Sequence, residues 1–450
     1  MSTPPAEGRT TAPRLTVIGT GYLGATHAIC MAVLGFEVLG VDVDRTKVER
    51  LAAGEVPFFE PGLPELLRKA LDSGRLRFGT DFAEAAAFGD VHFVCVGTPQ
   101  APDSDAADLT YVRSAVRRLA ENLDRKALVV GKSTVPVGTA AELTALVHEV
   151  APAGEEVELA WNPEFLREGF AVQDTMNPDR LVFGVGSEWA EQQLRAAFAP
   201  VVEAHGTPVL VMDLPTAELV KVAANSFLAT KISYINAMAE VCEATGADVT
   251  ALAGALAHDA RIGGRFLRPG LGFGGGCLPK DIRAFKHRAQ ELGVGQAVTF
   301  LGEVDAINKR RRARTVDLVR ELAGGSLDGA RIAAWGAAFK PDSDDIRDAP
   351  ALDVAVLLQD AGAQVTVYDP EAMDNARRAY PQLSYADSAM DAARDADVVV
   401  LLTEWAQFRE VDPEILAGVV AHRRVVDGRH ALDRDLWSSA GWEYRALGRP

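Results

Sequence analysis

A glycine-rich turn near the start of the chain restricts the possible fold more than any other feature. Residues Gly19–Gly24, with the sequence GTGYLG, match the pattern G-x-G-x-x-G. An apolar segment over 15–18 precedes this turn, and an alanine-rich helical segment follows it. A second strand over 37–41 then leads to Asp42. This order of elements predicts a β-α-β unit of a doubly wound sheet.

Each glycine of the pattern has a separate role when such a turn binds a dinucleotide. The first allows the tight turn, the second lets the backbone approach a pyrophosphate, and the third lets helix pack on strand. Asp42 is placed to accept hydrogen bonds from a ribose 2′-hydroxyl, which favours NAD over NADP. Because Arg45 and Lys47 follow closely, a preference for NADP stays open. The alternative to a dinucleotide site is a glycine turn that packs a generic α/β unit.

Further apolar strands over 91–96, 127–130 and 157–160 alternate with helical stretches, which predicts a parallel sheet. Gly97 and Thr98 follow the first of them, at the carboxyl edge where cofactors bind. In this part of the chain, we expect cofactor contacts from Gly19, Gly21, Tyr22, Leu23, Gly24, Asp42, Lys47, Gly97 and Thr98.

The opening pattern returns near residue 330, after a long segment with few helix breakers over 216–244. A strand over 331–335, a helix over 350–361 and a strand over 364–368 follow one another there. We therefore expect an α/β fold with two Rossmann-like, doubly wound domains, joined by a long central helix and a helical middle domain. The predicted divisions are a flexible tail over 1–13, a cofactor domain over 14–211, a central helical domain over 212–320 and a second nucleotide-binding domain over 321–450.

Charge and cysteine usage exclude several classes of protein. The chain has 46 lysines and arginines against 63 aspartates and glutamates, and a net charge of −17 argues against a nucleic-acid partner. The four cysteines form no C-x-x-C pair and the histidines do not cluster, so we expect no metal site. We expect no membrane span, because no run of about 18 apolar residues exists. The reducing cytoplasm is the expected location.

One cysteine stands in a setting that favours chemical reactivity. Cys277 follows three glycines and precedes Pro279, which suits the first position of a helix. The backbone dipoles at that helix N-terminus would stabilise a thiolate, and Lys280 would add to this effect. Asp281 would lie near the same helix end, where it can orient a water or take a proton. The alternative is a small residue that fills a tight turn, and packing is the expected role of the other three cysteines.

A thiolate beside a nicotinamide has a definite chemical meaning. It adds to an aldehyde, the adduct loses hydride, and the resulting thioester is hydrolysed to a carboxylate. Such a reaction needs donors for an oxyanion. Glu218, Lys221 and Asn225 share one face of the long helix, and the last two are candidate donors. A solvated polar stripe is the alternative interpretation of this spacing.

The same residues carry a resemblance to a known family. GTGYLG, FFEPGLPELL, KSTVPVGT, NPEFLREGFA, ELVKVAANSFLATKISYIN, RIGGRFLRPGLGFGGGCLPKD and AFKPDSDDIRDAP occur in the order typical of the UDP-glucose/GDP-mannose dehydrogenase family. The resemblance implies oxidation of UDP-glucose by two NAD⁺ to UDP-glucuronate, without a metal. GDP-mannose and UDP-N-acetylhexosamines are alternative substrates. A two-electron hydroxyacid dehydrogenase and a non-catalytic nucleotide-sugar sensor are alternatives that Cys277 disfavours.

The resemblance also implies roles for individual residues. Cys277 would be the nucleophile, with Lys221 and Asn225 as oxyanion donors. Asp281 and Thr134 would act on the water or relay a proton, and Glu168 would take part in acid–base work. Arg261 would reach the site of a neighbouring subunit, which implies a homodimer through the central helices. Further implied cofactor contacts are Thr134, Glu168, Cys277, Lys280 and Arg347. The implied substrate contacts are Glu164, Phe165, Leu166, Arg167, Glu168, Lys221, Asn225, Arg261, Phe266, Arg268, Gly270, Phe273, Gly274, Cys277, Phe339 and Lys340, and the second Rossmann-like domain would bind the UDP group.

Overall fold

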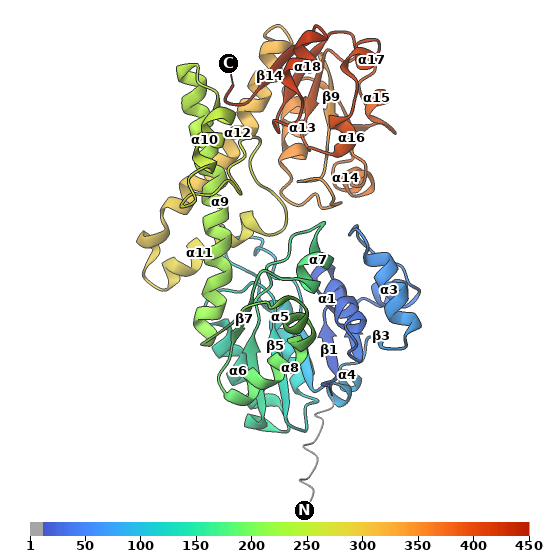
Figure 1. The fold of residues 1–450 in the computed structure, drawn as a ribbon, viewed down its shortest axis with the longest axis vertical. Coiled ribbons are helices and arrows are strands. Elements are labelled where there is room, and N and C mark those ends of the chain that lie inside the picture. Colours follow the sequence, from blue (N-terminus) through green and yellow to red (C-terminus); the bar gives the residue numbers. More distant parts are fainter. Residues whose placement is uncertain (1–11, 450) are drawn as a thin grey trace, which may run out of the picture. The chain divides into compact units, whose positions relative to one another are not determined.

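The computed structural model describes residues 12–449, so most of the predicted tail lies outside the described residues. The chain forms two compact units. Unit 1 comprises the residues up to Pro102 together with Ala107–Lys221. Unit 2 comprises Asp103–Ala106 together with the residues from Val222 onward. Each unit contains one of the two expected sheets (Figure 1).

Unit 1 is built on an eight-stranded sheet in the order β3-β2-β1-β4-β5-β6-β7-β8. Its strands are β1 (Leu15–Ile18), β2 (Val38–Val41), β3 (Leu76–Gly79), β4 (Val91–Val94), β5 (Ala127–Gly131), β6 (Val157–Trp161), β7 (Leu181–Gly184) and β8 (Val209–Met212). Its helices are α1 (Tyr22–Val33), α2 (Arg45–Ala52), α3 (Leu63–Asp72), α4 (Phe82–Phe88), α5 (Thr110–Ala120), α6 (Thr139–Val150), α7 (Ala171–Met176) and α8 (Glu188–His205).

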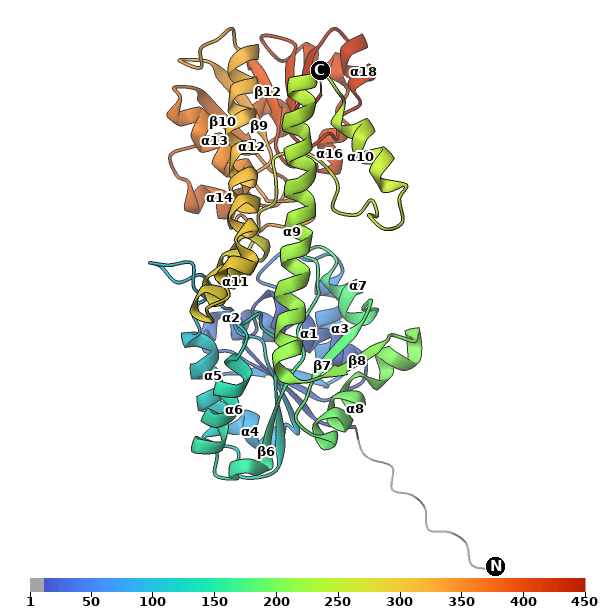
Figure 2. The same cartoon turned by 90° about the vertical axis from the view of Figure 1, so that its left-hand side faces the viewer.

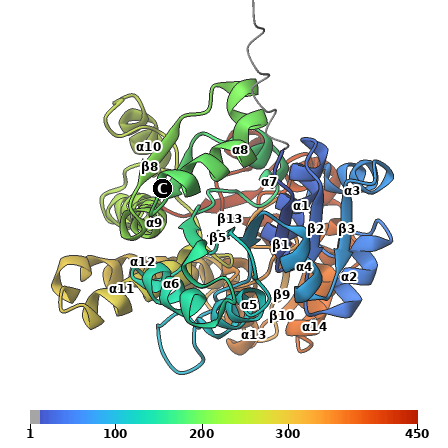
Figure 3. The ribbon, with the colours of Figure 1, turned by 90° about the horizontal axis from the view of Figure 1, so that it is seen from below.

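Separate apolar cores lie on the two faces of this sheet, as the doubly wound pattern requires. One core packs α1, α3 and α8 against residues such as Val17 and Phe93. The other packs α4, α5 and α6 against residues such as Ile18 and Val94. Figure 3 shows α1 and α8 on one side of the sheet and α5 and α6 on the other. Successive residues of β1 and β4 therefore serve opposite cores, which explains why both strands are buried throughout.

The sheet is parallel except at one position, where β6 pairs with β7 in the antiparallel sense. The strands for which a parallel sheet was predicted do pair in parallel, as β4 with β5 and β5 with β6, whereas β7 was not predicted. An antiparallel neighbour needs no crossover to the opposite edge of the sheet. The connection over 162–180, which contains the NPEFLREGFA segment, therefore starts and ends at the carboxyl edge of β6.

Helix α9 (Leu214–Thr245) begins in unit 1 and continues into unit 2. Its 32 residues contain no glycine, and Gly246 follows its end with a φ of +75°. In unit 2, α9 lies beside α12, where the Ser233 hydroxyl donates to the Val304 carbonyl at 2.7 Å (Figure 2). The central helices of unit 2 also include α10 (Val249–Ala257), α11 (Leu278–Glu291) and α12 (Phe300–Leu322).

The second sheet has six parallel strands in the order β11-β10-β9-β12-β13-β14. Its strands are β9 (Arg331–Trp335), β10 (Gln364–Tyr368), β11 (Ser384–Tyr385), β12 (Val398–Leu401), β13 (Arg424–Asp427) and β14 (Glu443–Ala446). Its helices are α13 (Pro350–Asp360), α14 (Met373–Ala379), α15 (Ala389–Ala392), α16 (Ala406–Arg409), α17 (Pro413–Ala417) and α18 (Arg434–Ser439).

Two Rossmann-like sheets and a long central helix confirm the predicted fold class. The three predicted domain boundaries stay predictions. Between residues 12 and 449, no helix combines the length and apolar character that crossing a membrane requires.

Candidate active site

The glycine turn of unit 1 leaves space at the N-terminus of α1. A Cβ on Gly24 would lie 1.8 Å from the Gly19 carbonyl oxygen, so only glycine allows this close packing of helix on turn. A Cβ on Gly21 would meet no atom within 4 Å. No side chain caps this end of α1. The open position and the uncapped amides fit a pyrophosphate.

Asp42 follows β2, where a ribose is expected. Its carboxylate accepts from the amides of Thr20 at 2.7 Å and Asp44 at 3.0 Å, and from the Lys47 ammonium at 3.0 Å. Burial by itself raises the pKa of Asp42, but these donors outweigh burial and lower that pKa overall. An ionised carboxylate at this position fits the 2′-hydroxyl of NAD better than the 2′-phosphate of NADP.

We predict that Asp42→Ala raises the KM for NAD by about tenfold to a hundredfold, because a hydrogen bond to a charged group is lost. Steady-state kinetics with varied NAD would measure this change. Asp72→Asn removes an exposed carboxylate of α3 and is the matched control. An unchanged KM in Asp42→Ala would contradict the ribose assignment.

The carboxyl ends of β4 and β5 are tied together at predicted cofactor residues. The Thr98 hydroxyl donates to the Thr134 carbonyl at 2.7 Å. The Ser133 hydroxyl donates to the Val96 carbonyl at 2.5 Å. A Cβ on Gly97 would meet nothing within 4 Å, so the backbone there is open to a ligand. Thr98 and Thr134 therefore lie together at the edge that carries the glycine turn.

Lys221 and Glu164 form an ion pair of 3.1 Å, in which both side chains are largely buried. The Lys221 ammonium also lies 5.5 Å from the centre of the Phe165 ring. The Arg180 guanidinium stacks on that same ring at 3.9 Å. These contacts bring the start of the NPEFLREGFA segment to α9 within unit 1. Arg167, by contrast, donates to Asp174 through its side chain and its amide.

The polar face of α9 is buried, so the alternative of a solvated stripe is wrong. Glu218, Lys221 and Asn225 are all almost inaccessible to solvent. Glu218 accepts from the amides of Gly138 at 2.8 Å and Ala140 at 2.6 Å, which binds it to the start of α6. Its role is therefore structural, whereas Lys221 and Asn225 remain the candidate donors.

In unit 2, Cys277 is the N-cap residue of α11 and is exposed. Buried Asp281, in the first turn, accepts from Asn225 Nδ2 at 2.7 Å and from the Lys280 ammonium at 2.6 Å. The structure thus brings the cysteine, the carboxylate and the amide donor of α9 together. None of the four cysteines, which all lie in the described chain, is in a disulfide. Cys30, Cys95 and Cys242 are buried, and burial raises the pKa of Cys30 and Cys95 to about 12.

The glycine loop before Cys277 packs against two segments from the second sheet region. A Cβ on Gly276 would lie 2.2 Å from the guanidinium carbon of Arg347, so a side chain at that position would displace this arginine. Gly275 donates to the Arg347 carbonyl at 2.9 Å. A Cβ on Gly275 would lie 2.9 Å from the Phe339 ring. Phe339 and Arg347 therefore lie beside the loop, and their predicted contacts with substrate and cofactor stay predictions.

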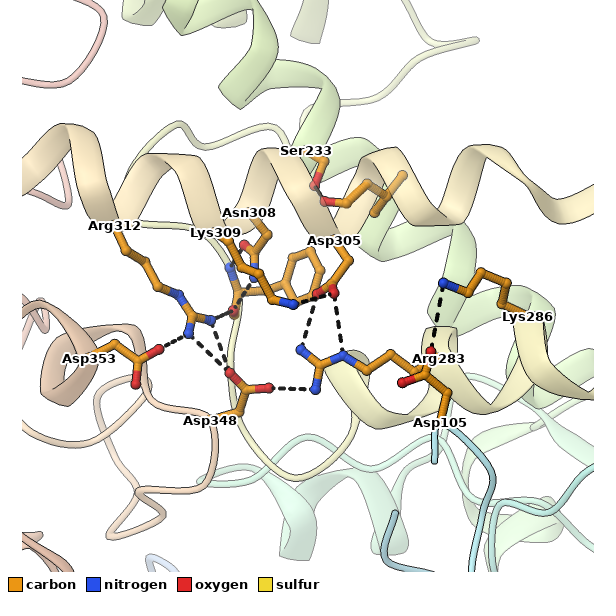
Figure 4. Close-up of polar contacts among 12 residues, drawn as sticks. Asp105, Ser233, Arg283, Lys286, Asp305, Asn308, Lys309, Arg312, Asp348 and Asp353 are labelled. Carbon is orange, nitrogen blue, oxygen red and sulfur yellow. Dashed lines mark hydrogen bonds and ion pairs between the residues drawn. The ribbon is translucent and has the colours of Figure 1, made fainter. Parts of the chain in front are cut away.

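A polar network in unit 2 fixes the same loop, and the sequence analysis did not identify it. The Asn308 side chain holds both the amide of Phe273, at 2.7 Å, and its carbonyl, at 2.8 Å. Arg312 donates to the Phe273 carbonyl at 3.2 Å and to Asp348 at 3.1 Å. Arg283 joins Asp348 to Asp305 (Figure 4). Arg429 adds a further tie, because it donates to the carbonyls of Gly272 and Phe339.

The other predicted substrate residues of unit 2 differ in exposure. The Arg261 side chain is 89% exposed and pairs with Asp259. Phe266, with a φ of +64°, and Arg268 are exposed as well. Gly270 is buried and donates to Asn236 at 2.9 Å, and the Lys340 ammonium lies 5.5 Å from the Phe339 ring. Across residues 12–449, no three His, Cys, Asp or Glu side chains gather as metal ligands would.

Comparison with known sequences gives matches along most of the chain. Profiles of the UDP-glucose/GDP-mannose dehydrogenase family match over its NAD binding domain at residues 13–202, its central domain at 215–310 and its UDP binding domain at 333–434. A UDP-glucose 6-dehydrogenase of Rhizobium meliloti is 41% identical over 97% of this chain and 100% of its own length. One from Pseudomonas aeruginosa is 40% identical over 97% of this chain and 98% of its own.

Solved structures show the same similarity. A UDP-glucose dehydrogenase from Pyrobaculum islandicum is 38% identical, with a TM-score of 0.89 and complete coverage of both chains. A UDP-D-ManNAc dehydrogenase from Pyrococcus horikoshii is 26% identical, with a TM-score of 0.84, over 97% of this chain and 99% of its own.

Proposed function

Because the chain belongs to the UDP-glucose/GDP-mannose dehydrogenase family, we propose that it oxidises UDP-glucose at C6 to UDP-glucuronate with two NAD. The observation that carries this proposal is Cys277 at the N-terminus of α11, where Asp281 of the first turn accepts a hydrogen bond from Asn225 of α9. A simple alcohol dehydrogenase needs no such thiol, whereas oxidation to an acid through a thioester does.

The proposed reaction begins with oxidation of the C6 alcohol to an aldehyde. NAD, when bound, supplies the hydride acceptor for this oxidation and for the next. The Cys277 thiolate then forms a bond to the aldehyde carbon, and Lys221 and Asn225 donate to the resulting oxyanion. Loss of hydride from this thiohemiacetal leaves a thioester. Water, oriented by Asp281 and Thr134, attacks the thioester and expels the Cys277 thiolate, while Glu168 takes part in proton transfer.

The remaining predicted contacts are proposed as binding groups. Asp42 and the GTGYLG turn hold NAD, and Lys280 and Arg347 add contacts to it. The NPEFLREGFA segment, Phe339, Lys340 and the loop before Cys277 hold the sugar nucleotide. A thiol nucleophile suits the reducing cytoplasm, where we place the reaction.

Sequence identity to the relatives supports UDP-glucose as the substrate over other sugar nucleotides. Those named for UDP-glucose are about 40% identical over nearly the full length, whereas the UDP-D-ManNAc dehydrogenase is 26% identical. Initial rates of NADH formation with UDP-glucose, UDP-N-acetylglucosamine and GDP-mannose test this choice. We expect the highest kcat/KM with UDP-glucose. A higher kcat/KM with UDP-N-acetylglucosamine or GDP-mannose would contradict the choice of UDP-glucose.

We also propose that the chain forms a homodimer through its central helices. Phe227, Tyr234 and Val241 are 67%, 51% and 53% exposed on α9. Residues seven apart lie on nearly the same face of a helix, so these three form an apolar stripe. Arg261, exposed on the same unit, is available to a partner's site.

We predict that Phe227→Asp shifts the chain from a dimer toward its monomer of 48.0 kDa, because a buried, unpaired charge opposes association. Light scattering after size exclusion would measure the mass. Ile415→Asp changes a residue that is 65% exposed on α17 and is the control. A wild-type monomer, or a dimeric Phe227→Asp variant, would contradict this interface.

A further inference from the structure

Glu60 is a buried carboxylate in the FFEPGLPELL segment, to which the proposed reaction assigns no role. It lies before α3 and is only 3% exposed. The segment is far in sequence from the loop that follows β6, yet Glu60 binds that loop. One carboxylate oxygen accepts from the Gly169 amide at 2.8 Å. The other accepts from the Val172 amide at 3.2 Å.

The first of these oxygens also accepts a short hydrogen bond from the Tyr22 hydroxyl. The Gly169 amide lies 3.0 Å from the same hydroxyl. The Tyr22 ring also packs on the Phe58 ring, with a centroid distance of 4.9 Å. This contact and the hydrogen bond to Glu60 together hold the orientation of the Tyr22 side chain. Tyr22 is the first residue of α1, directly after Gly21 of the glycine turn. One carboxylate thus joins the cofactor helix to the loop after β6.

The residue before Gly169 is Glu168, to which the proposed mechanism gives proton transfer. Burial raises the pKa of the Tyr22 hydroxyl, and the neighbouring charges of Glu60 and Glu168 raise it further, so Tyr22 stays a donor. Glu168 lies near this cluster, because the amide of its neighbour Gly169 bonds to Glu60 there. Anchoring Gly169 and Val172 restricts the backbone on the C-terminal side of 164–168. The Lys221–Glu164 ion pair restricts it on the N-terminal side.

We propose that Glu60 is a positioning residue for the oxidation. Its carboxylate fixes the backbone at Gly169 and Val172 and so holds the 164–168 loop in the form that binds the sugar nucleotide, while Tyr22 connects this anchor to α1. The inference rests on the proposed function, because it takes the 164–168 loop as part of the substrate site.

Glu60→Gln is the most direct test, because the glutamine has nearly the same shape. One oxygen can serve only one of the two amide sites, and its NH₂ group then faces an N–H donor at the other. We expect the KM and the dissociation constant for UDP-glucose to rise about tenfold, with a smaller change in kcat. Tyr22→Phe keeps both amide bonds and should raise the KM less.

Glu65→Gln, on the exposed first turn of α3, is the matched control and should leave both constants unchanged. Hydrogen exchange of the peptide over 163–172 should speed up in Glu60→Gln but not in the control. A purely structural role would lower the melting temperature without changing the KM of the folded enzyme. If Glu60→Gln does not fold, a raised KM in Tyr22→Phe supports the inference and an unchanged one overturns it.

Different results would overturn the proposed function and the positioning role of Glu60. A wild-type chain that binds UDP-glucose without oxidising it overturns the proposed function alone. A folded Glu60→Gln variant with an unchanged KM and dissociation constant overturns the role of Glu60 alone.

Discussion

Cys277→Ala is expected to abolish formation of UDP-glucuronate, with a loss in rate of about a thousandfold or more, because no other group replaces the nucleophile. The other three cysteines are buried, and burial keeps Cys30 and Cys95 protonated, so neither offers a thiolate. The acid would be measured by chromatography after incubation with UDP-glucose and NAD. Because Cys277 is exposed at a helix end, its replacement by alanine should leave the melting temperature nearly unchanged.

Cys242→Ala is the control for this experiment. Cys242 packs in a small core with Ile235, Ala239 and Val249, so its loss should affect stability and not chemistry. Acid formation by Cys277→Ala at a rate within tenfold of the wild type would rule out a thioester on this residue.

Lys221→Met is expected to lower kcat by about a hundredfold to a thousandfold, as loss of an oxyanion donor does in other acyl-transfer sites. The methionine retains much of the buried volume of lysine but cannot donate. It also leaves Glu164 without its partner at 3.1 Å, so some rise in the KM for UDP-glucose should accompany the fall in kcat. Steady-state kinetics with saturating NAD would separate the two effects.

Lys69→Met, on the exposed surface of α3, is the control and should retain full activity. A kcat in Lys221→Met within threefold of the wild type would mean that Lys221 serves only to pair with Glu164.

Elements with a strong local pattern could be predicted from the sequence. The strand over 15–18 is found as β1, and the helix expected over 216–244 is found as Leu214–Thr245. Both depend on properties of neighbouring residues, namely an apolar run before a glycine turn and a long stretch without helix breakers. The strand β11 was not predicted, because two residues carry too little periodicity. The edge strand β3 was not predicted either, because its sequence LRFG is not an apolar run and it is partly exposed.

The contacts that fix the site could not be predicted in the same way. Glu60 binds Gly169 across 109 residues of sequence, and Asn308 binds Phe273 across 35. Glu60, Gly169 and Phe273 lie in motifs of the sequence analysis, whereas Asn308 does not. The spacing of residues within one motif does not show which distant segment that motif contacts. The polar face of α9 is an example of what spacing does not predict. Glu218 and Lys221 share that face, yet Glu218 binds the start of α6 and Lys221 pairs with Glu164.

The ratio of NADH to consumed UDP-glucose, with limiting UDP-glucose and excess NAD, tests the central claim most directly. Oxidation of an alcohol to an acid through a thioester on Cys277 predicts two NADH per UDP-glucose, with UDP-glucuronate as the product. One NADH per UDP-glucose, with an aldehyde or ketone released, would contradict the account.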